Sequence, residues 1–122
     1  MTQVKDMIDE KLDFALADQL GWVNAWDGIR LVWLDGKTNE FRRKVTDWHP
    51  STDPAASLEV QAKAIEVDAA LYLKTLSAIV YGTTYAKVEE YDLIALIEVK
   101  RLLLASPRER AEAAYITLQG ST

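Results

Sequence analysis

The chain has no cysteine and a single histidine, His49, among its 122 residues. Without cysteine it forms no disulfide and uses no thiolate chemistry, so its stability is independent of the redox state of its compartment. Asp47 and Asp53 stand near His49, but a metal or acid–base site needs further ligands at a defined spacing, and the sequence shows none. We therefore expect a protein that is not an enzyme and that holds no metal and no cofactor.

Basic residues and long apolar runs are scarce as well. The sequence has 14 lysines and arginines against 19 aspartates and glutamates, and the net charge of −5 argues against direct binding of double-stranded nucleic acid. The most apolar segment, residues 69–86, is interrupted by Lys74 and by hydroxyl groups, so we expect no membrane span. Charged residues near the start of the chain differ from a signal peptide, and we expect a cytoplasmic location.

Apolar residues make up 49% of the sequence and charged residues 27%, a balance typical of a soluble protein with a packed core. The length suits one domain, residues 1–122. Helical spacing of the apolar residues predicts four helices, at residues 2–20, 54–80, 88–102 and 106–118.

Two of these helices have clear start signals. Ser106-Pro107-Arg108-Glu109 is a capping box with proline at the first helical position. Asp53-Pro54 is an N-cap followed by proline, and Ser51 and Thr52 offer further oxygens to the free amides of the first turn. The same helix start could instead receive an anion.

A different pattern lies between the first two helices. Residues 29–34 and 41–46 are β-type runs on either side of an Asp35-Gly36 turn, and four tryptophans fall within residues 22–48. The sequence therefore predicts an α+β fold, a predominantly helical single domain with a β-hairpin near residues 29–46 packed on helices. An alpha-beta-alpha sandwich is one arrangement of these elements.

Two apolar segments stay open between helix and strand, residues 69–81 and 91–104. For the first segment, a heptad-like seam through Leu58, Ile65, Tyr72 and Leu76 favours one helix over residues 54–80, whereas a break near Val67 would leave a strand at residues 71–81. The segment after residue 88 is apolar on more than one side, which predicts self-association into a homo-oligomer.

Charged and aromatic side chains around the hairpin form the candidate binding site. Its cations either protect an exposed strand edge or hold an anionic ligand against the tryptophans. The candidate binding residues are Trp33, Arg42, Arg43, Lys44, Trp48, His49, Ser51, Thr52 and Asp53. The acidic face of the first helix is either solvated or a docking surface; its residues are Asp6, Asp9, Glu10, Asp13 and Asp18.

Two stretches resemble a known family. Residues 12–22, which end in Gly21-Trp22, and the run Trp48-His49-Pro50-Ser51-Thr52-Asp53-Pro54-Ala55-Ala56 are similar to the small phage and prophage proteins of the phage ABA (alpha-beta-alpha) sandwich domain family. The resemblance implies a phage origin and the cytoplasm of a host cell. It also implies strands between residues 67 and 104, where this sequence favours helix, and it transfers no activity.

Three functions follow as hypotheses. The first is a non-enzymatic accessory protein that binds a host or phage protein, as a counter-defence inhibitor of the anti-CRISPR kind would. The second is a sponge that sequesters an anionic signalling nucleotide between the tryptophans, the basic hairpin and the helix start at Asp53. The third is a virion or assembly component.

Overall fold

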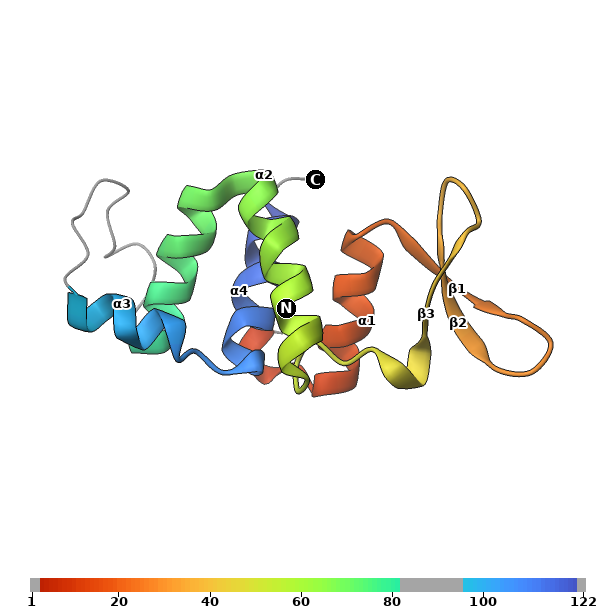
Figure 1. The fold of residues 1–122 in the computed structure, drawn as a ribbon, viewed down its shortest axis with the longest axis horizontal. Coiled ribbons are helices and arrows are strands. Elements are labelled where there is room, and N and C mark those ends of the chain that lie inside the picture. The colour runs from red at the N-terminus through yellow and green to blue at the C-terminus, as the bar shows by residue number, and fades with distance from the viewer. Residues whose placement is uncertain (1–2, 82–95, 121–122) are drawn as a thin grey trace.

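The computed structural model describes residues 3–81 and 96–120, which form a predominantly helical α+β fold as predicted (Figure 1). In chain order the elements are η1 (Val4–Asp6), α1 (Asp9–Gln19), β1 (Trp22–Trp26), β2 (Leu31–Asp35), β3 (Phe41–Lys44), η2 (Val45–Asp47), α2 (Pro54–Tyr81), α3 (Leu96–Leu103) and α4 (Pro107–Gln119). Among the helices of the described residues, none is both long enough and apolar enough to cross a membrane.

The strands form one antiparallel sheet in the order β1-β2-β3. The β2–β3 hairpin confirms the predicted hairpin, although residues 45–47 form a 3-10 turn instead of extending the strand. Strand β1 was not predicted. It pairs with β2 over its whole length, from Trp22 opposite Asp35 to Trp26 opposite Leu31. The sheet lies at one end of the row of described helices, beside α1, and not between two helical layers (Figure 1).

A close backbone contact joins the start of β1 to the β2–β3 turn. Gly36 N donates a hydrogen bond of 2.8 Å to Gly21 O. A Cβ on Gly36 would lie 2.6 Å from that same carbonyl oxygen, so no larger residue fits without a backbone shift. Gly21 itself has a φ of +82°, a conformation that suits glycine at the end of α1.

Helix α1 begins later than predicted, because the predicted helix at residues 2–20 is divided into η1 and α1. Arg108 of α4 explains the break. Its Nη2 donates hydrogen bonds to Val4 O at 2.9 Å and to Met7 O at 2.7 Å, so these carbonyls are engaged outside the helix. Its Nη1 also pairs with Asp9 Oδ1 at 2.8 Å, at the first turn of α1.

Helix α2 is a helical hairpin rather than one straight helix. The backbone of Asp68 is extended (φ −160°, ψ 86°), and its Oδ1 accepts a hydrogen bond of 3.0 Å from Leu71 N, as an N-cap does. The first arm, residues 54–67, and the second arm, residues 69–81, therefore run in different directions (Figure 1). A break does occur next to Val67, but the alternative of a strand at residues 71–81 is wrong, because the second arm is helical.

The break also moves the buried face of α2. The predicted seam put Leu58 and Ile65 in the core, yet these side chains are 48% and 41% exposed. The first arm instead buries the small residues Ala56, Val60 and Ala64. In the second arm, by contrast, the seam residues Tyr72 and Leu76 are buried in the core.

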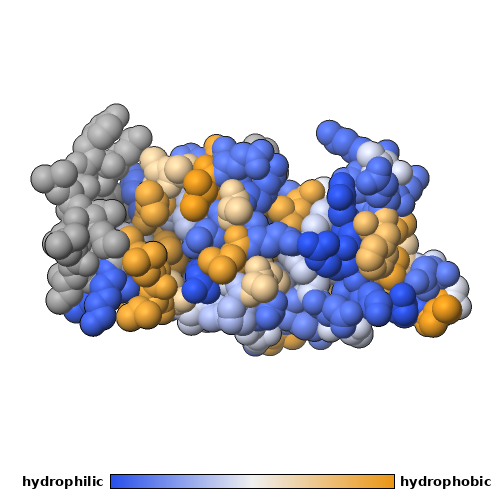
Figure 2. Space-filling view, viewed as in Figure 1, coloured by the Kyte–Doolittle hydropathy of each residue, from blue (hydrophilic) through white to orange (hydrophobic). Residues whose placement is uncertain are grey.

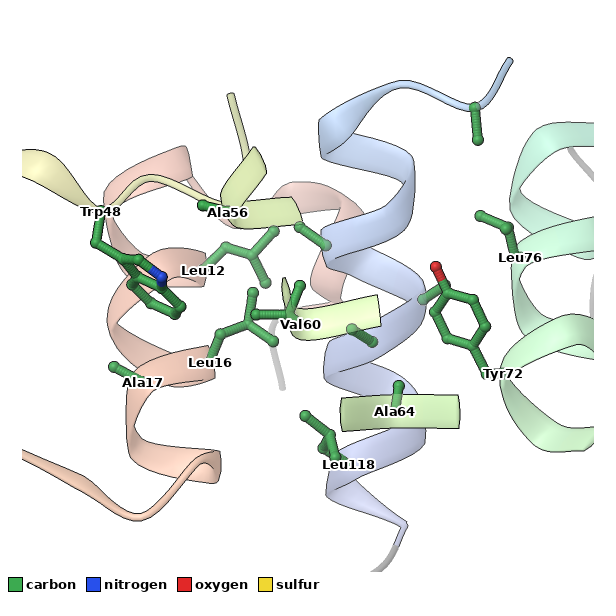
Figure 3. Packing of buried hydrophobic residues seen from close by; sticks show 14 of the residues in the cluster. Leu12, Leu16, Ala17, Trp48, Ala56, Val60, Ala64, Tyr72, Leu76 and Leu118 are labelled. Atoms are coloured by element: carbon green, nitrogen blue, oxygen red, sulfur yellow. The ribbon is translucent and has the colours of Figure 1, made fainter. Parts of the chain in front are cut away.

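Helix α4 is the centre of the core. It lies between α1 and the second arm of α2, while the first arm crosses over it (Figures 1 and 3). Its alanines Ala111 and Ala114 are fully buried, and small side chains let the surrounding helices approach closely. Its start confirms the predicted capping box, because Glu109 N donates to Ser106 Oγ and Ser106 N donates to Glu109 Oε1.

Helix α3 covers part of the helix predicted at residues 88–102. Residues 82–95 lie outside the described residues, and with them the first part of this predicted helix. Leu103, the last residue of α3, and Leu104 after it are 75% and 71% exposed. The predicted homo-oligomer stays a prediction.

Candidate functional site

The structure divides six of the nine predicted binding residues between two hollows at the junction of sheet and helices. One hollow, here called the aromatic cleft, has a volume of about 370 Å³ and lies between α1, β2 and the η2–α2 connection. The other, here called the basic groove, has a volume of about 320 Å³ and lies between the sheet and the first arm of α2. The single site that the sequence predicted is therefore not assembled.

The aromatic cleft combines aromatic walls with acidic groups. Its walls include Phe14, Trp33 and Trp48, and the rings of Phe14 and Trp33 pack edge to face with centroids 5.0 Å apart. Trp33 and Trp48 are only 4% and 3% exposed, so each mainly belongs to the core. The other residues that line the cleft are Asp9, Glu10, Asp13, Val45, Thr46, His49 and Thr52.

Asp13 links α1 to the Pro-Ser-Thr-Asp segment, although the sequence placed it on a polar face. It is 4% exposed, and its Oδ1 accepts a hydrogen bond of 2.8 Å from Ser51 N. Burial raises the pKa of the Asp13 carboxyl, while the hydrogen bond from Ser51 and the charge of His49 act in the opposite direction. Asp13 is therefore a structural acid that also forms part of the cleft.

His49 is held at both ring nitrogens. Its Nε2 lies 2.7 Å from Thr46 O, and since a carbonyl oxygen only accepts, this nitrogen is the donor. Its Nδ1 lies 3.6 Å from Asp13 Oδ2. In the described residues no group of three or more histidine, aspartate or glutamate side chains could hold a metal ion.

The basic groove contains cations that are already paired. Arg42 Nη2 lies 2.9 Å from Asp35 Oδ2, and Arg43 Nη2 lies 2.6 Å from Glu59 Oε2. The bond from Arg42 and two backbone amides hold the pKa of the Asp35 carboxyl well below its usual range. Strand β3 is an edge of the sheet, and cations along it are typical of a protected strand edge.

The start of α2 is capped by one residue of the three that the sequence offered. Asp53 Oδ2 accepts a hydrogen bond of 2.9 Å from Ala56 N. Ser51 is buried beneath α1, and Thr52 lines the aromatic cleft, away from the arginines. Lys44 lies outside both hollows, with its Nζ 3.9 Å from Asp47 Oδ2. The helix start and the basic strand therefore do not face one space.

Sequence reasoning missed the most exposed apolar surface of the sheet. Trp26, Ile29 and Leu31 are 64%, 78% and 46% exposed; we call these three residues the hairpin tip. Asp27 Oδ1 accepts hydrogen bonds from Ile29 N at 2.8 Å and Arg30 N at 2.9 Å, which orders the turn between them. The Asp-Gly pair at residues 27–28 was the signal that could have revealed this second hairpin.

Comparison of the chain with models of known families, with curated proteins and with solved structures finds no match. No residue role is therefore carried over from a relative. The function has to be argued from the two hollows and the hairpin tip.

Proposed function

We propose that this protein is a non-enzymatic binding protein that attaches to another protein through the hairpin tip. The observation that carries the proposal is the exposure of Trp26, Ile29 and Leu31 together on one turn. Apolar colour marks the outer end of the β1–β2 turn in Figure 2. Burying a large apolar side chain contributes about 1.5–3 kcal/mol, so three of them suffice for an anchor.

The order of the turn supports a binding role. Trp26 and Leu31 are directly opposite in the β1–β2 ladder, and Asp27 N donates a hydrogen bond of 3.1 Å to Arg30 O between them. A turn that is fixed before binding loses little conformational entropy when a partner covers it. Tryptophan is also among the residues most enriched at the energetic centres of interfaces.

The nucleotide sponge has less support from the site. Its stacking residues Trp33 and Trp48 are almost fully buried, and its cations Arg42 and Arg43 each face a carboxylate. An anion would have to compete with Asp35 and Glu59 for the guanidinium groups. No observation favours the third hypothesis, a virion or assembly component.

The partner that we propose is a protein of the host cell. The resemblance to phage proteins motivates this choice, and interference with a defence effector, such as a CRISPR effector, is the activity to test first. An accessory protein of this kind blocks a surface and needs no catalytic group of its own.

The test is affinity purification of the tagged protein from host lysate, with quantitative mass spectrometry. The double variant Trp26→Ser with Ile29→Ser removes two anchors. Leu58→Ser is the matched control, since Leu58 is also apolar and 48% exposed but lies on α2. We expect the tip variant to recover at least about tenfold less of a specific partner and the control to recover it fully. If both variants recovered the partner equally well, the hairpin tip would not be the surface that binds it.

A further inference from the structure

We infer that the aromatic cleft binds a cationic side chain, arginine or lysine, of the protein that the hairpin tip contacts. This inference rests on the proposed function and names the chemistry of the partner. It follows from three features of the cleft: its charge, its walls and its position on the sheet.

The charge of the cleft favours a cation. Three carboxylates from α1, those of Asp9, Glu10 and Asp13, line it, and no lysine or arginine of the described residues does. Asp9 is paired with Arg108 and Asp13 is bonded to Ser51 N, but the Glu10 carboxylate makes no hydrogen bond or ion pair with any described residue. Glu10 is exposed at the edge of the cleft and is therefore free to meet a positive charge from outside.

The walls of the cleft suit a cation that carries an apolar stem. The ring of Phe14, which is partly exposed, supplies aromatic surface that attracts a guanidinium or ammonium group and also packs against methylene groups. Trp33 is buried and supports this ring through their edge-to-face contact. A volume of about 370 Å³ lies at the small end of the range for ligand pockets, so a single long side chain is of a suitable size. A bare metal ion would use neither the aromatic walls nor the space.

The position of the cleft connects it to the hairpin tip. Trp33 and Leu31 are two residues apart on β2, so their side chains lie on the same face of the sheet, and Trp26 opposite Leu31 shares that face. Two residues along a strand span about 7 Å. A partner that covers Trp26 and Leu31 with apolar groups can therefore place a neighbouring basic residue in the cleft, against Phe14 and Glu10.

The first test needs no identified partner and uses small probes of defined charge. Butylguanidinium and butylammonium are titrated into the isotopically labelled protein, with uncharged butanol and anionic butyrate as controls, and amide and indole shifts are followed by NMR. We expect saturable shifts at Phe14, Trp33 and Trp48 with the two cations alone. Shifts that do not saturate, or equal shifts with butanol or butyrate, would overturn the inference.

Two variants with the same change of charge localise the effect. Glu10→Gln removes the unpaired carboxylate of the cleft, and we expect it to weaken the binding of butylguanidinium by about two- to fivefold. Asp18→Asn removes an exposed charge from the same helix but away from the cleft, and we expect no change. Equal weakening by both variants would show a general charge effect and would overturn the cleft as a specific site.

A second titration separates this inference from the proposed function. The probes are the capped tripeptides Leu-Gly-Arg and Leu-Gly-Gln, applied to the unmodified protein and to the Trp26→Ser variant. If the cleft and the tip act together, the arginine peptide binds more tightly than the glutamine peptide, and Trp26→Ser weakens it. Binding of butylguanidinium without any effect of Trp26→Ser would keep the cation site but reject its link to the hairpin tip. If both tripeptides bind equally tightly and Trp26→Ser weakens both, the inference about the cleft is rejected and the proposed function remains intact.

Discussion

Trp48 Nε1 donates a hydrogen bond of 2.9 Å to Glu59 Oε1, while Glu59 Oε2 accepts one of 2.6 Å from Arg43 Nη2. One carboxylate on the first arm of α2 therefore holds both β3 and the connection that precedes α2. Trp48 also packs against Trp22 of β1, with ring centroids 4.8 Å apart. Two of the predicted ligand-binding residues are thus parts of the joint between the sheet and the helices.

Replacement of Glu59 tests this joint. Glu59→Ala leaves the buried indole N–H of Trp48 without its partner, and we expect the free energy of unfolding to fall by about 1–3 kcal/mol. Glu59→Gln keeps an oxygen acceptor for Trp48 and loses the exposed ion pair, so it should lose less than about 1 kcal/mol. Urea unfolding followed by circular dichroism measures both, and equal losses would contradict the role given to the Trp48 bond.

The buried carboxyl of Asp13 predicts a particular dependence of stability on pH. Burial raises its pKa above the ordinary value of 3.8, so the folded state binds the proton more tightly than the unfolded state does. The stability that this proton provides is fully present below pH 3.8 and is lost as the pH rises through the raised pKa. Asp13→Asn does not titrate and can still accept the bond from Ser51 N.

We therefore expect Asp13→Asn to gain stability relative to the unmodified protein as the pH rises from 3.5 toward 7, roughly the range in which carboxyl groups titrate. Asp18→Asn, an exposed change on the same helix, should show no such trend. Urea unfolding at a series of pH values measures the difference. If the difference in free energy of unfolding between Asp13→Asn and the unmodified protein stayed constant with pH, the folded state would not disfavour the ionised Asp13 carboxylate.

The cap at Asp68 should stabilise the second arm of α2. Asp68→Ala removes the acceptor for Leu71 N, and we expect a loss of about 1 kcal/mol. Asp68→Asn retains a capping oxygen and should remain within a few tenths of a kcal/mol of the unmodified protein. If thermal unfolding showed equal losses for alanine and asparagine, the charge of Asp68 and not its cap would be responsible.

The contact between Gly36 and Gly21 predicts a strong difference between two glycines. Gly36→Ala places a methyl group against a backbone oxygen, and we expect a loss of about 1–3 kcal/mol through strain. At Gly120, with a φ of −69° and ordinary contacts, alanine fits, and we expect a gain of about 0.4–1 kcal/mol. Chemical unfolding measures the free energy of unfolding of both variants. A Gly36→Ala variant as stable as the unmodified protein would contradict the prediction.

Local signals in the sequence sufficed for much of the fold. The capping box at Ser106, the N-cap at Asp53 and the turn at Asp35 each act through neighbouring backbone groups, so each was predictable from a few residues. Helix α4 was likewise predictable from the helical spacing of its own apolar residues, since Ala111, Ala114 and Leu118 recur on one face and are buried.

The remainder depended on contacts between distant residues. Asp68 has the side chain of a cap, but Ala69 and Ala70 continue the helical pattern, so the reversal of α2 becomes evident only from its packing on α4. The candidate site was divided for the same reason. Arg43 finds its partner on Glu59, and Ser51 finds its partner on Asp13, 38 residues away in the chain.

The hairpin tip gives a last prediction that can be checked by tryptophan fluorescence. Trp26 is 64% exposed, whereas Trp33 and Trp48 are almost fully buried. We expect Trp26→Phe to remove most of the red-shifted emission that iodide quenches, while Trp48→Phe should remove emission that iodide does not reach. Trp26→Phe changes an exposed side chain and should not alter stability, whereas Trp48→Phe also loses the hydrogen bond to Glu59 and should be less stable.

If iodide quenched as large a fraction of the emission after Trp26→Phe as before, at low protein concentration, this would contradict the exposed tip. If Trp26 instead becomes protected as the concentration rises, a second copy of the chain covers the tip, as the predicted self-association would allow.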